Sequence, residues 1–256
     1  MADYQYAPGQ GAARAGDLAF DAGLRKFMTG VYTKLFLGIL VAGALAYAAG
    51  AIEPVSQLVY GTPLSLVVQW GPIVLLLGST FLMRNPSPLA TGILYWTIVS
   101  LIGLSLGSWV MMAETGASAA SRGGTQFTTT YTTIGEAFFI TASAFGVLSL
   151  WGYTSKKSLG ALGSFSVMAL WGVVAFSLLN FFLPPNSMFE WLILGAVFVL
   201  SAILVATSTQ QLKEGYLALA GDERSLAVMT NWGALNFFIS FVNMFRIVLM
   251  LLSSRN

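Results

Sequence analysis

The sequence contains no cysteine and no histidine, and it has few charged residues. Without thiols or imidazoles there is no disulfide, cysteine nucleophile, histidine base, c-type haem or zinc site built from these ligands. Charged residues make up 9% of the 256 positions, against about 25% in an average soluble domain. A formal net charge of +2 does not indicate nucleic acid binding. We therefore expect no cofactor, no bound metal, no nucleic acid partner and no enzymatic activity.

Hydrophobic residues, by contrast, make up 56% of the chain and gather in long runs without charge. A bilayer core of about 30 Å requires about 20 apolar residues in a helix. Lipid offers the backbone no hydrogen-bonding partner, and the runs are too long for barrel strands, so we expect helices. The sequence predicts an all-α membrane protein with seven transmembrane helices, at Leu35 to Ile52, Leu64 to Met83, Leu89 to Ala113, Ala137 to Ser155, Leu162 to Leu183, Trp191 to Leu212 and Ser225 to Phe245.

The predicted organisation is a flexible cytoplasmic tail at residues 1–30 followed by a transmembrane domain at residues 31–256. Seven crossings place nine of the twelve Lys and Arg residues on the side of the N-terminus, which predicts that this side is cytoplasmic. The apolar run continues past Arg246 to Leu252, which leaves open a re-entrant last segment with only six spans.

Ionisable residues are absent from the first six predicted spans, and all ten carboxylates lie in tails or connections. A buried proton relay or carboxylate cation site is therefore not expected. Arg246 is the single charge that could lie within the membrane, either as a side chain that snorkels to the headgroups or as a functional group. Asn236, Ser240 and Asn243 lie within about 60° of one helical face, which we expect to point into the bundle. Their role is either hydrogen bonding between helices or a hydrated ligand path.

One connection, residues 114–136, is long and rich in threonine, whereas the others are short. Such a segment is either disordered or packed against something, and the sequence does not choose between the two.

Four stretches resemble the Bax inhibitor-1/YccA family in its alphaproteobacterial form, and the resemblance extends over nearly the whole chain from residue 20 onward: Asp21 to Tyr32, Ala137 to Phe165, Ala206 to Tyr216 and Gly233 to Phe245. The resemblance implies six helices surrounding a central C-terminal helix, in a bacterial cytoplasmic (inner) membrane. It also implies links to pH-sensitive calcium leak, to control of eukaryotic cell death and, in bacteria, to a membrane-bound AAA protease. The family's calcium pore depends on two aspartates, one in a sixth-span Asp-Thr-Gln motif and one before Phe-x-Asn in the last span.

This chain departs from the family pattern at both positions, because Ser208 and Ser240 stand where the aspartates align. A serine hydroxyl does not titrate and gives a divalent cation no negative charge. We expect the pH-gated calcium site to be lost, while nearby polar residues keep an interior cluster: Thr209, Gln210, Asn236, Asn243, Arg246 and Asn180.

Two hypotheses follow for the function. The first is a non-enzymatic accessory, regulatory or structural partner of a larger membrane complex or of a membrane protease, with the segment 114–136 as a candidate contact to other integral membrane proteins. The second is a pH-independent or weak leak of calcium or another ion.

Overall fold

The computed structural model describes the backbone of residues 8–83, 85–120, 126–155, 157–182, 186–219 and 221–254. It describes the side chains of the same residues except 8–21, 82, 180, 181 and 187.

Helices form nearly all of the described chain, with one small hairpin. The elements are α1 (Pro8–Ala51), α2 (Glu53–Tyr60), α3 (Leu64–Leu82), α4 (Pro88–Thr115), β1 (Ser118–Ala120), β2 (Gln126–Thr128), α5 (Tyr131–Thr154), α6 (Gly160–Phe182), α7 (Ser187–Leu219) and α8 (Glu223–Ser253). All the helices except α2 contain a segment long and apolar enough to cross a membrane, which makes seven. The predicted all-α fold with seven spans is confirmed.

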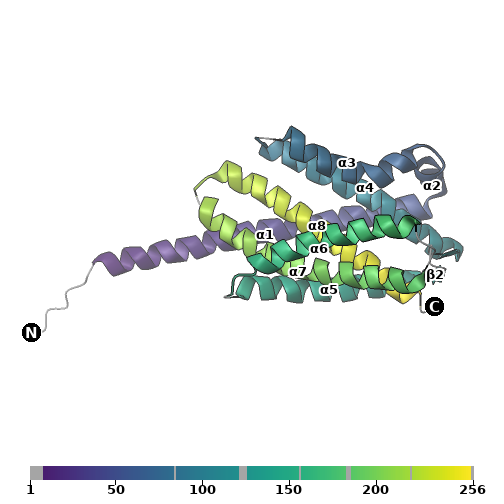
Figure 1. The fold of residues 1–256 in the computed structure, drawn as a ribbon. Helices are drawn as coiled ribbons and strands as arrows, with labels where there is room; N and C mark the ends of the chain where they lie inside the picture. The colour runs from purple at the N-terminus through teal and green to yellow at the C-terminus, as the bar shows by residue number, and fades with distance from the viewer. Residues whose placement is uncertain are drawn as a thin grey trace, which may run out of the picture.

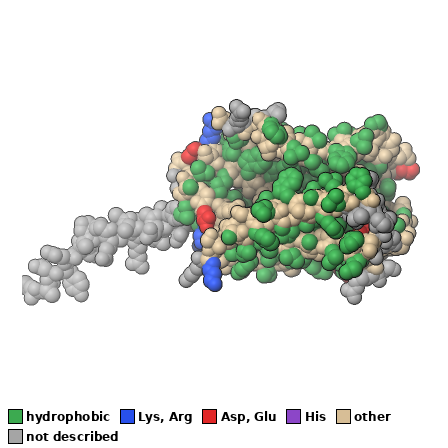
Figure 2. Space-filling view, viewed as in Figure 1, with side chains coloured by type: hydrophobic (Ala, Val, Ile, Leu, Met, Phe, Trp, Pro, Cys, Tyr) green, Lys and Arg blue, Asp and Glu red, His purple; other side chains and the backbone are tan. Residues whose placement is uncertain are grey.

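The long helices run alternately in opposite directions, so the connections gather at two ends of the bundle (Figure 1). We call the end with the α3–α4, α5–α6 and α7–α8 connections the basic end, and the opposite end the hairpin end. Figure 2 shows Lys and Arg side chains at the basic end and hydrophobic side chains over the surface between the two ends. This distribution fits a body whose middle contacts lipid.

The last helix, α8, is one uninterrupted helix of 31 residues, about 46 Å long at 1.5 Å per residue. This length exceeds the hydrocarbon thickness of a bilayer, so α8 is a full span and a re-entrant segment does not fit. The apolar run that continues past Arg246 is the last part of the same helix.

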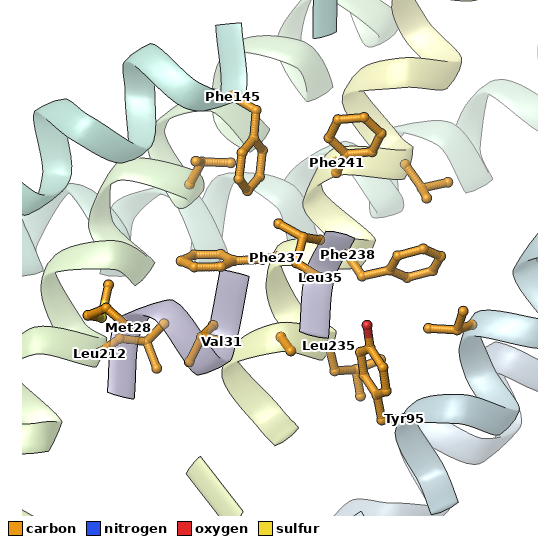
Figure 3. Packing of buried hydrophobic residues seen from close by; sticks show 14 of the residues in the cluster. Met28, Val31, Leu35, Tyr95, Phe145, Leu212, Leu235, Phe237, Phe238 and Phe241 are labelled. Carbon is orange, nitrogen blue, oxygen red and sulfur yellow. The ribbon is translucent and has the colours of Figure 1, made fainter. Parts of the chain in front are cut away.

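Burial is deepest around α8. In its most apolar segment 56% of the residues are buried, against 11% to 33% in the other six spans. Helices α1, α4, α5 and α7 pack directly on α8, while α3 packs on α4 and α6 packs on α7. Figure 3 shows phenylalanines of α8 directed into a core shared with Leu35 of α1, Tyr95 of α4 and Phe145 of α5. An enclosing ring of six helices stays a prediction.

Small residues allow α1 and α4 to pack closely. A Cβ atom added to Gly103 would lie 2.7 Å from the Cα atom of Ala42, and one added to Gly107 would lie 2.8 Å from the Cβ atom of Ala49. Such contacts are shorter than any that real Cβ atoms make. The glycine pair on α4 therefore sets the distance between the two helices.

The N-terminal boundary differs from the expected tail at residues 1–30, because helix α1 begins at Pro8. Leu24, Phe27 and Met28 are buried in the same core as Val31. Their spacing of i, i+3, i+4 and i+7 forms one apolar helical face, so hydrophobic packing continues the first span toward the N-terminus.

The Thr-rich connection carries the hairpin of β1 and β2, whose register pairs Ala119 with Phe127. The Phe127 side chain is 5% exposed, and the Thr129 hydroxyl lies 3.0 Å from the Ser253 hydroxyl at the end of α8. The sequence left open whether this connection is disordered or packed against something. Its described part is packed, and it packs on α8 of the same chain.

Candidate functional site

Four consecutive polar residues of α7, Thr207 to Gln210, are buried where α7 faces α5, α6 and α8. The Ser208 hydroxyl accepts a hydrogen bond of 2.9 Å from the Asn236 amide of α8. Ser240 is buried one helical turn after Asn236. The two positions where the sequence resemblance places aspartates therefore lie on neighbouring helices, and Ser208 is bonded to Asn236.

Thr209 belongs to a chain of hydroxyl groups that joins three helices. Its hydroxyl donates to the Val205 carbonyl oxygen at 2.8 Å and lies 3.3 Å from the Ser149 hydroxyl of α5. Ser149 is in turn hydrogen-bonded to the Tyr32 hydroxyl of α1. These groups satisfy one another in an apolar interior, which is the ordinary way in which buried hydroxyls are tolerated.

Gln210 connects α7 to the connection between α5 and α6. Its side-chain oxygen accepts from the Leu159 backbone N–H at 2.6 Å, and its side-chain nitrogen donates to the Lys157 carbonyl oxygen at 2.9 Å. Gln210 is buried, so its side chain takes the place of water as the hydrogen-bonding partner of these two backbone groups, which have no partner within the helices.

The polar face of α8 differs from the sequence expectation. Ser240 is buried as expected, but Asn236, Asn243 and Arg246 are exposed on the surface of the protein. The three exposed side chains lie within about 80° of one helical face. This face is uncovered because α3 packs on α4 and α6 packs on α7, so neither helix closes over it. We call these three residues the α8 stripe.

A groove of about 430 Å³ opens beside the first residue of the α8 stripe. Leu76 of α3, Ser208 and Gln211 of α7, and Trp232 and Asn236 of α8 line it. Its walls are mostly apolar, with the hydrogen-bonded pair of Ser208 and Asn236 on one side.

A second polar network, missed by the sequence reasoning, joins α1, α4 and α8 toward the basic end. The Lys34 ammonium donates to the Asn231 side-chain oxygen, and the Asn231 amide donates to Thr91 at 2.7 Å and to the Pro88 carbonyl oxygen at 2.9 Å. The Tyr95 hydroxyl donates to the Lys34 carbonyl oxygen at 2.6 Å. Lys34 precedes the first apolar run directly and therefore resembles an ordinary flanking charge in the sequence.

Carboxylates do not enter the interior in the described part of the chain. Six of the seven described Asp and Glu side chains are exposed and Glu190 is half-buried, and no three of them gather as metal ligands. The Asn180 side chain, the remaining member of the predicted polar cluster, lies outside the described residues. The described site can hydrogen-bond a ligand or partner, but it offers no carboxylate to a cation.

Comparison with known proteins extends this description. The family model described as inhibitor of apoptosis-promoting Bax1 matches residues 24–256. An uncharacterized protein of Caulobacter vibrioides is 46% identical over 243 residues, which cover 91% of this chain and 90% of the relative. An uncharacterized protein of Rickettsia prowazekii is 30% identical over 92% of both chains. The inner membrane protein YbhL of Escherichia coli is 29% identical over 91% of this chain and 94% of its own length.

The match covers six of the candidate spans entirely and the first one, Ala22–Ala51, from residue 24 onward. The chain therefore belongs to the Bax inhibitor-1 family of multi-pass membrane proteins.

Proposed function

We propose that this protein is a non-enzymatic membrane protein that binds another integral membrane protein, as an accessory or regulatory component of a larger complex or of a membrane protease. The observation that carries the proposal is the α8 stripe. Asn236, Asn243 and Arg246 lie on an exposed face of a transmembrane helix, where lipid tails offer no hydrogen bond. A partner helix with polar side chains would satisfy these groups.

Arg246 supports the same proposal through its charge. Within the described residues it forms no ion pair with a carboxylate, and it lies seven residues, about 10 Å, before the end of α8. Charged side chains at such depth normally pair with an opposite charge or snorkel to the headgroups. A partner carboxylate at this depth would neutralise the guanidinium and orient the two proteins.

The hairpin provides a second candidate contact in the segment 114–136. Its inner side is occupied by the chain itself, since Phe127 is buried and Thr129 contacts Ser253. The strand β1 is exposed along its whole length of 3 residues. A partner would therefore approach β1 from outside the bundle.

The proposed location is the cytoplasmic (inner) membrane of a bacterium, with the N-terminus in the cytoplasm. The relative YbhL is an inner membrane protein, and the Lys and Arg residues of this chain are concentrated at the basic end, which includes the N-terminal part of α1. Lys and Arg residues that flank transmembrane helices are in excess on the cytoplasmic side of the membrane.

Photo-crosslinking in native membranes tests the proposed partner surface. A photo-reactive phenylalanine analogue is placed at position 243 on the α8 stripe and, as a control, at Val174, which is 48% exposed on α6. We expect a discrete protein adduct at position 243 and lipid adducts at position 174. The combined change Asn243→Leu and Arg246→Leu, with a probe at position 236, should remove the protein adduct without lowering the amount of folded protein.

Two results would contradict the partner role. One is a probe at position 243 that captures lipid alone. The other is the same set of adducts at positions 243 and 174, because a nonspecific collision does not distinguish a polar helix face from an apolar one.

A weak, pH-independent ion leak is the alternative function, and the groove beside Ser208 and Asn236 favours it. Its volume of about 430 Å³ is enough for several water molecules, and the amide and hydroxyl provide polar contacts. A leak along this groove should fall when Asn236→Leu removes the amide, measured as calcium entry into liposomes at one fixed pH. An unchanged flux would eliminate this route.

A further inference from the structure

A long furrow separates α1 from α5. A cavity of about 780 Å³ begins at Arg25 near the basic end and reaches Ile39, Phe138 and Phe241. A second cavity of about 310 Å³ shares these last three residues and extends to Trp109 toward the hairpin end. The two cavities therefore adjoin at these three residues and follow one another along the membrane-spanning part of the protein, and we call them together the α1–α5 furrow.

The packing of the helices explains why the furrow is open. Helix α1 packs chiefly on α4 and α8, whereas α5 packs chiefly on α7 and α8, so α8 forms the floor between them. Glycines widen the furrow on both sides. A Cβ atom added to Gly43 of α1 or to Gly146 of α5 would have no atom within 4 Å.

The lining is apolar along most of its length and carries a charge at one end. Arg25 is the only charged residue among the described residues that line the furrow, and its side chain is exposed. A second cation, Lys213, lies beside this end, with its ammonium 5.1 Å from the ring centroid of Tyr153, which lines the furrow. An occupant should therefore combine a negative head with a hydrocarbon chain.

Size distinguishes a lipid chain from a protein helix. A helix about 10 Å wide that crosses a bilayer of about 30 Å occupies about 2,400 Å³. The two cavities, about 780 and 310 Å³, hold less than half of that volume. We propose that the α1–α5 furrow is a binding site for one anionic phospholipid, with an acyl chain in the furrow and the phosphate at Arg25.

This inference does not depend on the proposed partner role, because the furrow and the α8 stripe lie on different faces of α8. Phe241 forms the floor of the furrow and is buried, while Asn236 and Asn243 are exposed. Failure of either proposal leaves the other intact.

Native mass spectrometry of the full chain, after removal of its lipids in detergent, tests the site. Dioleoyl-phosphatidylglycerol is compared with dioleoyl-phosphatidylcholine at equal concentration. Each cationic residue near a headgroup contributes about 1 kcal/mol, which is about fivefold, so with Arg25 and Lys213 at this end we expect one bound phosphatidylglycerol with an occupancy at least about fivefold above that of phosphatidylcholine.

Two variants with matched controls separate the two parts of the site. Gly146→Leu fills the furrow and should remove bound lipid of both kinds, while Gly172→Leu, which also has no neighbour within 4 Å but lies on α6, should not. Arg25→Gln should lower the preference for phosphatidylglycerol about fivefold, while Lys26→Gln, the adjacent exposed cation that does not line the furrow, should leave it intact.

Thermal unfolding of each variant shows whether it folds, and a photo-reactive residue at Phe36 replaces Gly146→Leu if that variant does not. Phe36 lines the furrow and is 60% exposed. Lipid adducts at position 36 that clearly exceed those at the lipid-facing control Val174 support the proposal. Protein adducts there, equal lipid retention by Gly146→Leu and Gly172→Leu, or equal lipid preference in Arg25→Gln and Lys26→Gln would overturn it.

Discussion

The Gln210 side chain joins α7 to the backbone of the connection between α5 and α6. It pairs with the Leu159 N–H and the Lys157 carbonyl oxygen, and it is buried. Gln210→Leu replaces the amide with an apolar side chain of similar size, which leaves these backbone groups without this partner. We expect the free energy of unfolding to fall by about 1 to 3 kcal/mol, measured by denaturant titration in detergent.

The neighbouring Gln211 provides the control for this prediction. Its side chain is exposed and lines the groove, so Gln211→Leu should change the free energy of unfolding little. Equal loss of stability in the two variants would show that Gln210 does not act through the α5–α6 connection.

Asp222 begins α8 as its N-cap, and this carboxylate makes the start of the helix sensitive to acid. The Ser225 hydroxyl and the backbone N–H groups of Ser225 and Arg224 donate to it, and these bonds lower the pKa of Asp222 below its usual value. Because the pKa is lower in the folded state, the ionised carboxylate stabilises the fold at pH values above the unfolded-state pKa. This stabilisation is lost as the pH falls through the folded-state pKa.

The pH dependence of protease cleavage at residues 219–224 tests this cap. Cleavage of the parent protein by an acid-active protease should increase as the pH falls below about 4, the usual pKa of an aspartate. Asp222→Asn keeps a capping oxygen that does not titrate, so its cleavage should depend less on pH. An identical pH profile for the two proteins would contradict the role of the carboxylate.

At the scale of helices, the contact between α1 and α4 depends on the absence of side chains. Gly103→Ala would place a Cβ atom 2.7 Å from the Ala42 Cα atom, and backbone cannot move aside as a flexible side chain can. We expect separation of the helices and a loss of about 1 to 3 kcal/mol in the free energy of unfolding.

Gly92→Ala on the same helix is the matched control for Gly103→Ala. A Cβ atom added to Gly92 would lie 3.7 Å from the Asn231 amide nitrogen, an ordinary contact. Alanine also has a higher helix propensity than glycine, so this variant should be as stable as the parent or slightly more stable. Comparable destabilisation by both changes would show that close packing at Gly103 is not the cause.

The positions of the spans could be predicted from the sequence because runs without charge are long and lipid permits only helices. The exposure of the polar face of α8 could not be predicted from the sequence. The spacing of Asn236, Ser240 and Asn243 defines one face of the helix, but which neighbours cover that face depends on contacts between distant segments. The same reason hides the network of Lys34 with Asn231, residues that are 197 positions apart.

The prediction of a flexible tail up to residue 30 overlooked a local pattern. Leu24, Phe27 and Met28 continue the apolar face of α1, although Arg25 and Lys26 between them suggest a polar segment. The two cations are exposed on the other face of the helix. Periodicity, which separates the two faces, predicts this part of the chain better than composition does.

At the scale of the whole molecule, the central claim is that the described residues place no carboxylate in the interior. Ser208 is hydrogen-bonded to Asn236, Ser240 is buried on the facing helix, and the described carboxylates lie near the two ends of the bundle. Hydroxyl groups of serine keep their protons at every physiological pH. Protonation therefore has no group to act on at positions 208 and 240.

Calcium entry into liposomes that contain the purified protein, measured at pH 6 and at pH 8 against empty liposomes, tests this claim most directly. We predict the same rate of entry at the two pH values for the parent protein. The double change Ser208→Asp and Ser240→Asp should make the rate depend on pH, because it introduces two carboxylates on the neighbouring helices α7 and α8. Calcium entry through the parent protein that switches between pH 6 and pH 8 would contradict the account.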